Sequence, residues 1–179
     1  NGTAKCWGAN ANGQLGDNTV IDRTTPTLVP GLTTVTAITA GANHTCAVLA
    51  NGTAKCWGAN ADGQLGDTTL VAKKVPTTVT GLTAAVAVTA GANHTCALLA
   101  NGTAKCWGDN ANGQLGDNTV IDRTTPTLVP GLATVTAITA GGNHTCAALA
   151  NGTAKCWGAN ADGQLGDTTL VAKKVPTTV

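Results

Sequence analysis

The chain has 179 residues, a net charge of +1 and 42% hydrophobic residues, and its nine acidic side chains are all Asp. This near-neutral balance gives no electrostatic basis for binding nucleic acid or a membrane surface, and no apolar run is long enough to insert into a bilayer. Phe, Tyr and Met are absent, so the core has to be built from Val, Leu, Ile, Ala, Thr and four Trp, which favours strands.

The sequence repeats every 50 residues almost without change. The octapeptide Asn-Gly-Thr-Ala-Lys-Cys-Trp-Gly opens at Asn1 and again at Asn51, Asn101 and Asn151. A fixed period of this length indicates an array of small units that bury their apolar faces by stacking on one another. The units alternate between two types, since Ile21-Asp22-Arg23-Thr24 corresponds to Val71-Ala72-Lys73-Lys74 in the next unit.

In chain order, residues 1–32 supply only the second half of a unit, and 33–82 is the first complete one. Its pattern predicts an alternating strand at 35–40, a second strand at 44–49 and a third at 53–57, after an Ala-Asn-Gly turn. A short fourth strand is predicted at 76–79, where Pro76 suits an outer edge.

Four short antiparallel strands per unit form the blade of a β-propeller. The sequence therefore predicts an all-β fold in which residues 1–179 are a single propeller-repeat array of about three and a half blades. We expect an outer half-blade at 1–32, followed by blades at 33–82, 83–132 and 133–179.

The cysteines recur ten residues apart across each predicted hairpin. A three-residue turn places Cys46 opposite Cys56, within disulfide range. The same register predicts Cys96–Cys106 and Cys146–Cys156, with buried free thiols as the alternative and a zinc site as a weaker one. Cys6 has no counterpart ten residues earlier, so we expect it to be unpaired and the chain to belong to a longer array.

The remaining candidates for chemistry are predicted to be structural. A histidine follows the Gly turn of each complete unit, where it is expected to hold the turn: His44, His94 and His144. The tryptophans end the third strand and are expected to pack between blades: Trp7, Trp57, Trp107 and Trp157. The oxygen-bearing residues around Asp109 and Asp117 do not have the spacing of a calcium-binding EF-hand. We therefore predict no catalytic, cofactor-binding or metal-binding residue.

Three stretches of the sequence between residues 91 and 116 carry a resemblance to a known repeat. They are Gly91-Ala-Asn-His94-Thr-Cys-Ala97-Leu-Leu99, Asn101-Gly102 and Trp107-Gly-Asp-Asn110-Ala-Asn-Gly113-Gln-Leu-Gly116. This pattern resembles the propeller repeats of the regulator of chromosome condensation family, and the match covers the whole chain. The resemblance implies blades of a ring that usually has seven. The family includes guanine-nucleotide exchange factors, an inhibitor of β-lactamases and bacterial surface repeats, so the fold does not select one function. The cysteine-bearing form here is most similar to the bacterial extracellular type.

Uniform repeats and paired cysteines favour a non-enzymatic extracellular or cell-surface protein with a structural or adhesive role, such as a filament building unit. The expected partners are further repeats of the same chain or other copies, and another protein or a glycan is also compatible. A soluble protein- or carbohydrate-binding propeller, such as an enzyme inhibitor, is the alternative. Guanine-nucleotide exchange ranks lower, because uniform repeats do not readily build one asymmetric site.

Overall fold

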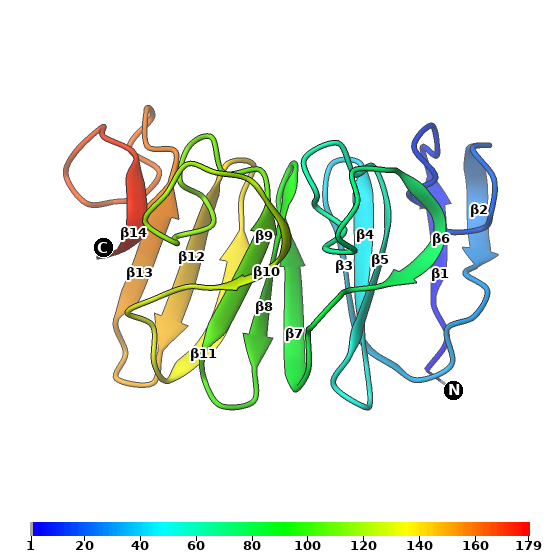
Figure 1. Cartoon of the computed structure of the whole chain (residues 1–179), viewed down its shortest axis with the longest axis horizontal. Helices are drawn as coiled ribbons and strands as arrows, with labels where there is room; N and C mark the ends of the chain where they lie inside the picture. The colour runs from blue at the N-terminus through cyan, green and yellow to red at the C-terminus, as the bar shows by residue number, and fades with distance from the viewer. Residues whose placement is uncertain (1) are drawn as a thin grey trace.

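A computed structural model describes residues 2–179 as a row of antiparallel sheets (Figure 1). A two-stranded sheet is followed by three four-stranded sheets, and the two chain ends lie at opposite ends of the row. No helix long and apolar enough to cross a membrane occurs in this part of the chain. The strands are β1 (Lys5–Gly8), β2 (Arg23–Leu28), β3 (Val35–Ala40), β4 (His44–Leu49), β5 (Ala54–Gly58), β6 (Lys73–Thr78), β7 (Ala85–Ala90), β8 (His94–Leu99), β9 (Ala104–Gly108), β10 (Arg123–Leu128), β11 (Val135–Ala140), β12 (His144–Leu149), β13 (Ala154–Gly158) and β14 (Lys173–Thr178).

Each four-stranded sheet is one propeller blade with its strands in chain order. The order β3-β4-β5-β6 recurs in β7-β8-β9-β10 and in β11-β12-β13-β14. The first strands of successive blades face one another, because β7 lies against β3 and β4, and β11 lies against β7 and β8. The blades therefore stack through their inner strands, as the all-β propeller prediction requires.

The strands fall close to their predicted positions, with one clear difference. β3 and β4 have the predicted bounds, whereas the outer strand β6 begins at Lys73 instead of at residue 76. The ladder between β5 and β6 is irregular, so Gly58 pairs with Lys73 and Cys56 pairs with Thr77. Pro76 lies inside this irregular stretch on the outer edge, where its missing N–H costs no ladder bond.

The cores lie between neighbouring sheets. The core between the first two complete blades combines Val48, Leu65 and Val79 of one blade with Ala97 and Trp107 of the next. The following junction uses the equivalent residues, including Leu98, Leu115 and Trp157. A blade therefore buries one of its faces only through its neighbour.

Glycine allows the closest approach within each junction. Gly66 has a φ of +69°, and a Cβ added there would lie 2.8 Å from Nε1 of Trp107 and 3.0 Å from its Cδ1. The Trp107 side chain is fully buried against it. Gly16 and Gly116 have the same relation to Trp57 and Trp157. Only a residue without a side chain permits both the left-handed backbone and the indole contact.

Three disulfides cross the hairpins between the second and third strands. They join Cys46 to Cys56, Cys96 to Cys106 and Cys146 to Cys156, which are the pairs that the hairpin register predicts. The Cα atoms of each pair are 4.1 Å apart, because the two cysteines lie directly opposite each other in the ladder. Cys6 is unpaired and half-buried, and burial raises the pKa of its thiol.

We predict that one of the seven cysteines is alkylated when the chain is unfolded without reductant, and that all seven are alkylated after reduction. Unfolding exposes Cys6 but leaves the three disulfides intact. Intact-mass measurement after alkylation counts the modified thiols, and peptide mapping places the single label on Cys6. Seven labels before reduction would show that the hairpin cysteines are free thiols.

Candidate interaction surface

The long loop of each unit presents two exposed apolar side chains, which we call the apolar tip. These loops join the third strand of a unit to its fourth, and they lie along the same edge of the row in Figure 1. A row of apolar tips on one edge is a candidate contact surface, because exposed apolar side chains gathered on one side of a molecule can bury area against a partner. The exposed fractions are 48% and 60% for Val20 and Ile21, 58% and 63% for Leu70 and Val71, 48% and 60% for Val120 and Ile121, and 68% and 64% for Leu170 and Val171.

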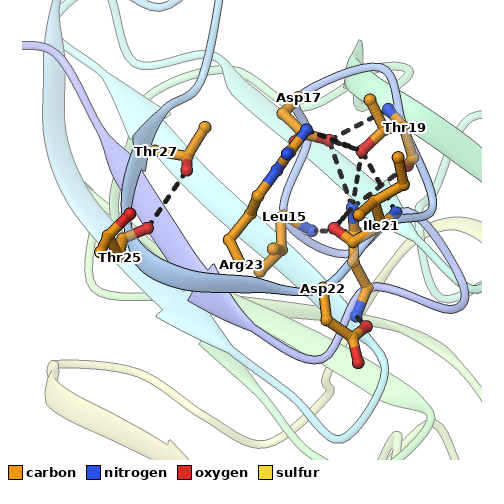
Figure 2. A network of polar contacts seen from close by, with 9 residues as sticks. Leu15, Asp17, Thr19, Ile21, Asp22, Arg23, Thr25 and Thr27 are labelled. Carbon is orange, nitrogen blue, oxygen red and sulfur yellow. Dashed lines mark hydrogen bonds and ion pairs between the residues drawn. The ribbon is translucent and has the colours of Figure 1, made fainter.

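A buried asparagine fixes the backbone of each tip. Nδ2 of Asn10 donates to Oδ1 of Asp17 at 3.2 Å, to the carbonyl of Thr19 at 3.2 Å and to that of Ile21 at 3.1 Å. Its Oδ1 accepts from the backbone N–H of Leu15 at 3.0 Å (Figure 2). Because the carbonyl of a tip residue bonds to a fully buried side chain, the tip is held in a fixed position. The same bonds recur around Asn60, Asn110 and Asn160.

An ion pair closes the base of each loop. Nε of Arg23 donates to Oδ2 of Asp17 at 2.7 Å, and both the N–H and the hydroxyl of Thr19 donate to Oδ1 (Figure 2). Burial alone would raise the pKa of Asp17, but the hydrogen bonds from Thr19, Arg23 and Asn10 outweigh it and lower the pKa to about 2. The carboxylate therefore stays ionised and keeps the loop closed at neutral pH.

The loops come in two chemical types, as the alternating sequence predicts. Arg23 and Arg123 pair with Asp17 and Asp117 in the first and third loops. Lys73 replaces the arginine in the second loop and lies 3.4 Å from Asp67. Lys173 and Asp167 repeat that arrangement in the fourth loop at 3.0 Å. The contact surface therefore has a true period of two blades.

Each of the first three loops is also bonded to the outer strand of the next blade. The backbone N–H of Asn18 donates to the carbonyl of Lys74 at 3.0 Å, and Thr68 and Asn118 donate likewise to Thr124 and Lys174. These bonds fix the apolar tips relative to one another as well as to their own blades. The row is therefore preorganised for a partner that contacts several tips at once.

Each histidine closes its own turn through its backbone carbonyl, which accepts from the N–H of Gly41, Gly91 or Gly141, and the side chains of His44 and His94 also bind the next blade. Nε2 of His44 lies 2.9 Å from Oγ1 of Thr95, whose hydroxyl donates to the carbonyl of Gln64 at 2.8 Å. Since that hydroxyl hydrogen is used, Nε2 of His44 must be the donor. His94 makes the same bond to Thr145. His144 is part of the last blade and is only partly buried.

The carbonyl of Gln64 also accepts a hydrogen bond from the tryptophan of the next blade. Nε1 of Trp107 donates to the carbonyl of Gln64 at 2.9 Å, and Trp157 donates equally to Gln114. These two indoles and that of Trp57 are fully buried between blades. Trp7 is 59% exposed, contrary to the prediction for all four tryptophans, because no earlier blade packs on it within residues 2–179.

The loop carboxylates and amides form local hydrogen-bond networks. In the described part of the chain, no three His, Cys, Asp or Glu residues lie close enough to hold a metal ion. The loop around Asp109 and Asp117 uses its polar atoms internally, since Asn110 donates to Asp117 and Gln114 donates to Asp109.

The family comparison matches nearly the whole chain. Two models of the regulator of chromosome condensation (RCC1) repeat match, one over residues 1–48, 51–98 and 101–148 and the other over 35–64, 85–114 and 135–164. The chain belongs to the RCC1 repeat family. Its sheets are RCC1 propeller blades, and the match covers every unit. A search of curated proteins finds no match.

Solved structures show the same propeller architecture. Human WBSCR16 is 26% identical with a TM-score of 0.88, over 99% of this chain and 48% of that one. Prp20p from Saccharomyces cerevisiae, reported with its binding properties to Gsp1p and histones, is 25% identical with a TM-score of 0.82, over 98% and 45%. Yeast RCC1 (Prp20) bound to Kap60 is 23% identical with a TM-score of 0.85, over 99% and 44%. The chain thus spans about half the length of these structures.

Sequence reasoning missed the apolar tips. Each tip is a pair of aliphatic residues that follows Asp-x-Thr in a loop rich in Gly and Asn. An aliphatic pair at the same position of four loops was a readable signal for exposure, because a loop between edge strands has little core to enter.

We predict that acid destabilises this RCC1-repeat chain in two steps. Burial, and then the charge of the neighbouring histidine, lower the pKa of His44 and His94 from 6.5 to about 4. The unfolded chain therefore takes up protons first, and stability falls as pH drops from 6.5 to 4, by roughly 3 kcal/mol per histidine. The pKa values of Asp17, Asp67 and Asp117 are lowered in the folded chain, so their protonation causes a second loss of stability below pH 4.

Urea unfolding between pH 8 and 3 measures both steps. The His94→Gln variant is the matched control, because an amide can donate to Thr145 but does not titrate. Below pH 4 this variant should lose as much unfolding free energy as the native chain. Between pH 6.5 and 4 it should lose about half as much as the native chain. An unchanged profile for this variant would contradict the assignment of the first step to the histidines.

Proposed function

We propose that the chain is a non-enzymatic, extracellular structural or adhesive protein that works by contact between repeated propeller surfaces. The observation that carries the proposal is the row of apolar tips, whose eight side chains are 48% to 68% exposed on loops of fixed geometry. An array of equivalent contacts suits a repetitive partner, such as another copy of the same array.

The polar chemistry of the loops supports a contact role. The most buried polar side chains, among them Asn10, Asn60 and Asn110, hold the loops, and His44 and His94 hold the blades together. Groups used in this way are tied to neighbours by short hydrogen bonds. The exposed apolar side chains are the groups with contact area to offer a partner.

The disulfides support an oxidising compartment. The first two lie in buried hairpins and the third in a partly buried one, and all three join strands that the ladder already pairs. Such bonds form and persist in extracellular or periplasmic surroundings, and they are rare in reducing ones. We therefore place the protein outside the cell or on its surface, in keeping with the resemblance to bacterial extracellular repeats.

A soluble protein- or carbohydrate-binding propeller, such as an enzyme inhibitor, is the second candidate. The structure of Prp20p, reported with its binding to Gsp1p and histones, favours a protein partner for this fold. Guanine-nucleotide exchange ranks below both. The four tips are nearly equivalent, and such uniformity does not favour one specialised nucleotide-handling site.

Sedimentation velocity over a range of concentrations tests the proposal. The chain should form assemblies that grow with concentration. A variant with one apolar residue of each tip changed to Thr should associate roughly a thousandfold more weakly, because four burials of about 1 kcal/mol each add to about 4 kcal/mol. The four changes are Ile21→Thr, Val71→Thr, Ile121→Thr and Val171→Thr.

A variant with Leu28→Thr and Leu128→Thr is the matched control. These leucines are 53% and 52% exposed at the ends of outer strands, away from the tips, so their loss should leave association unchanged. A single species of 17.6 kDa at every concentration would contradict the structural role. Equal association by the native chain and the tip variant would show that the tips are not the contact.

A further inference from the structure

The sequence Asn-x-Thr, which is the acceptor signal for N-linked sugars, occurs in two settings in every complete blade. One setting is Asn-His-Thr where the second strand begins, and the other is Asn-Gly-Thr in the turn between the second and third strands. The first is found at Asn43, Asn93 and Asn143, and the second at Asn51, Asn101 and Asn151. The structure separates the two settings, because an enzyme has to reach both the asparagine amide and the threonine.

The threonine of Asn-His-Thr is inaccessible in the folded chain. Thr45, Thr95 and Thr145 are 5%, 0% and 0% exposed. The hydroxyl of Thr95 donates to the carbonyl of Gln64 at 2.8 Å, which is a bond between neighbouring blades, and the other two make the equivalent bonds. An enzyme could reach these threonines only if the blades opened.

The same two side chains are accessible in the Asn-Gly-Thr turn. Asn51 is exposed and Thr53 is half-buried. Oδ1 of Asn51 accepts from the N–H of Thr53 at 3.1 Å and from its hydroxyl at 2.7 Å. Among residues 2–179, no group accepts a hydrogen bond from Nδ2 of Asn51, the atom that would carry the sugar. The turns at Asn101 and Asn151 have the same geometry.

The next blade holds this turn in place. Gly52 has a φ of +75°, and its carbonyl accepts from the N–H of Ala85 in the next blade at 2.9 Å. Gly102 makes the equivalent bond to Val135. Within its own hairpin, the N–H of Gly52 donates to the carbonyl of Leu49 at 2.9 Å. The asparagine is therefore presented on a fixed turn, which favours recognition by an enzyme.

The Asn-Gly-Thr turns lie along the edge of the row opposite the apolar tips (Figure 1). Their octapeptide is identical in all units, whereas the long loops alternate between two types. Each complete blade therefore offers one equivalent acceptor, and a sugar attached there would leave the apolar tips uncovered.

We propose that Asn51, Asn101 and Asn151 are attachment sites for N-linked sugars on the folded chain. The donor is a sugar whose anomeric carbon is activated by a diphosphate, carried on a nucleotide or on a lipid. Transfer forms a bond between Nδ2 and the anomeric carbon and breaks the bond from that carbon to the diphosphate oxygen. The diphosphate leaves with the electron pair, and a base of the transferring enzyme takes the proton that Nδ2 loses.

This assignment deepens the proposed function and rests on its extracellular placement, because N-linked sugars are typical of surface loops in secreted proteins. Sugars on the hairpin edge would keep that edge hydrated and direct association to the edge with the apolar tips. Sugar transfer and association are measured separately, so failure of transfer is distinguishable from failure of the contact role in sedimentation.

Transfer to the purified, folded and oxidised chain tests the proposal in two arms. One arm contains a soluble N-glycosyltransferase with UDP-glucose, and the other a membrane oligosaccharyltransferase with a lipid-diphosphate-linked oligosaccharide. Peptide mapping should place sugar on Asn51, Asn101 and Asn151 in at least one arm, which identifies the donor. Labelling of the Asn-His-Thr asparagines should be about tenfold slower or more, because it requires local opening of a blade.

The proposal is overturned if neither arm labels the turn asparagines, or if both settings are labelled at the same rate. Two short peptides show whether the fold makes the choice. Peptides of residues 40–45 and 49–54 each contain one setting without its tertiary contacts, and they should be labelled at similar rates. Failure of the 40–45 peptide alone would assign the choice to local sequence and overturn the role of the fold.

The Thr53→Ala variant tests the acceptor geometry within one molecule. It should lose the sugar at Asn51 and keep it at Asn101 and Asn151, which serve as internal controls. Thr53→Ser should keep all three, because the serine hydroxyl can make the same bond to Oδ1 of Asn51. Undiminished labelling of Asn51 in the Thr53→Ala variant would contradict the assignment.

Discussion

The contact between a glycine of one blade and a tryptophan of the next is the constraint on which this array depends. Gly66 reaches a left-handed conformation at the point where Trp107 packs against it, and a Cβ would come within 2.8 Å of the indole nitrogen. The carbonyl of Gln64 accepts hydrogen bonds from both Trp107 and Thr95, and the hydroxyl of Thr95 accepts one from His44. Backbone conformation, packing and hydrogen bonding meet at one junction, so a change in any of them alters the fit between blades.

This junction is directional, and its direction explains the surfaces of the molecule. The glycine, glutamine and histidine of one blade contact the following blade. Its tryptophan and threonine contact the preceding one. Stacking in one direction places every loop on the same edge of the row and aligns the apolar tips (Figure 1). The row of apolar tips therefore arises from the repeat itself.

Much of the fold is predictable from the sequence, because the repeat shows the same pattern several times. The 50-residue period predicts the blades, the alternation of Val35 to Ala40 predicts β3, and the hairpin turn places Cys46 opposite Cys56. The start of β6 is not predictable in this way, since the irregular ladder opposite Gly58 depends on how two strands meet. The bond from His44 to Thr95 and the exposure of Trp7 depend on contacts between blades, which local patterns do not report. The apolar tips lie between these cases, because the aliphatic pairs are visible in the sequence but their fixed geometry requires the network around Asn10.

The most direct measurement compares the free energies of unfolding of Gly66→Ala and Gly81→Ala. Both glycines have nearly the same left-handed φ, +69° and +70°, but no atom lies within 4 Å of a Cβ at Gly81, whereas Trp107 and Val79 lie within contact at Gly66. Both variants carry the cost of a left-handed alanine, about 1 kcal/mol. We predict that Gly66→Ala loses a further 1 to 3 kcal/mol, roughly the cost of overpacking a filled core, and that its Trp107 fluorescence shifts toward that of an exposed indole. Equal losses for the two variants, with unchanged fluorescence, would contradict the claim that this contact holds the blades together.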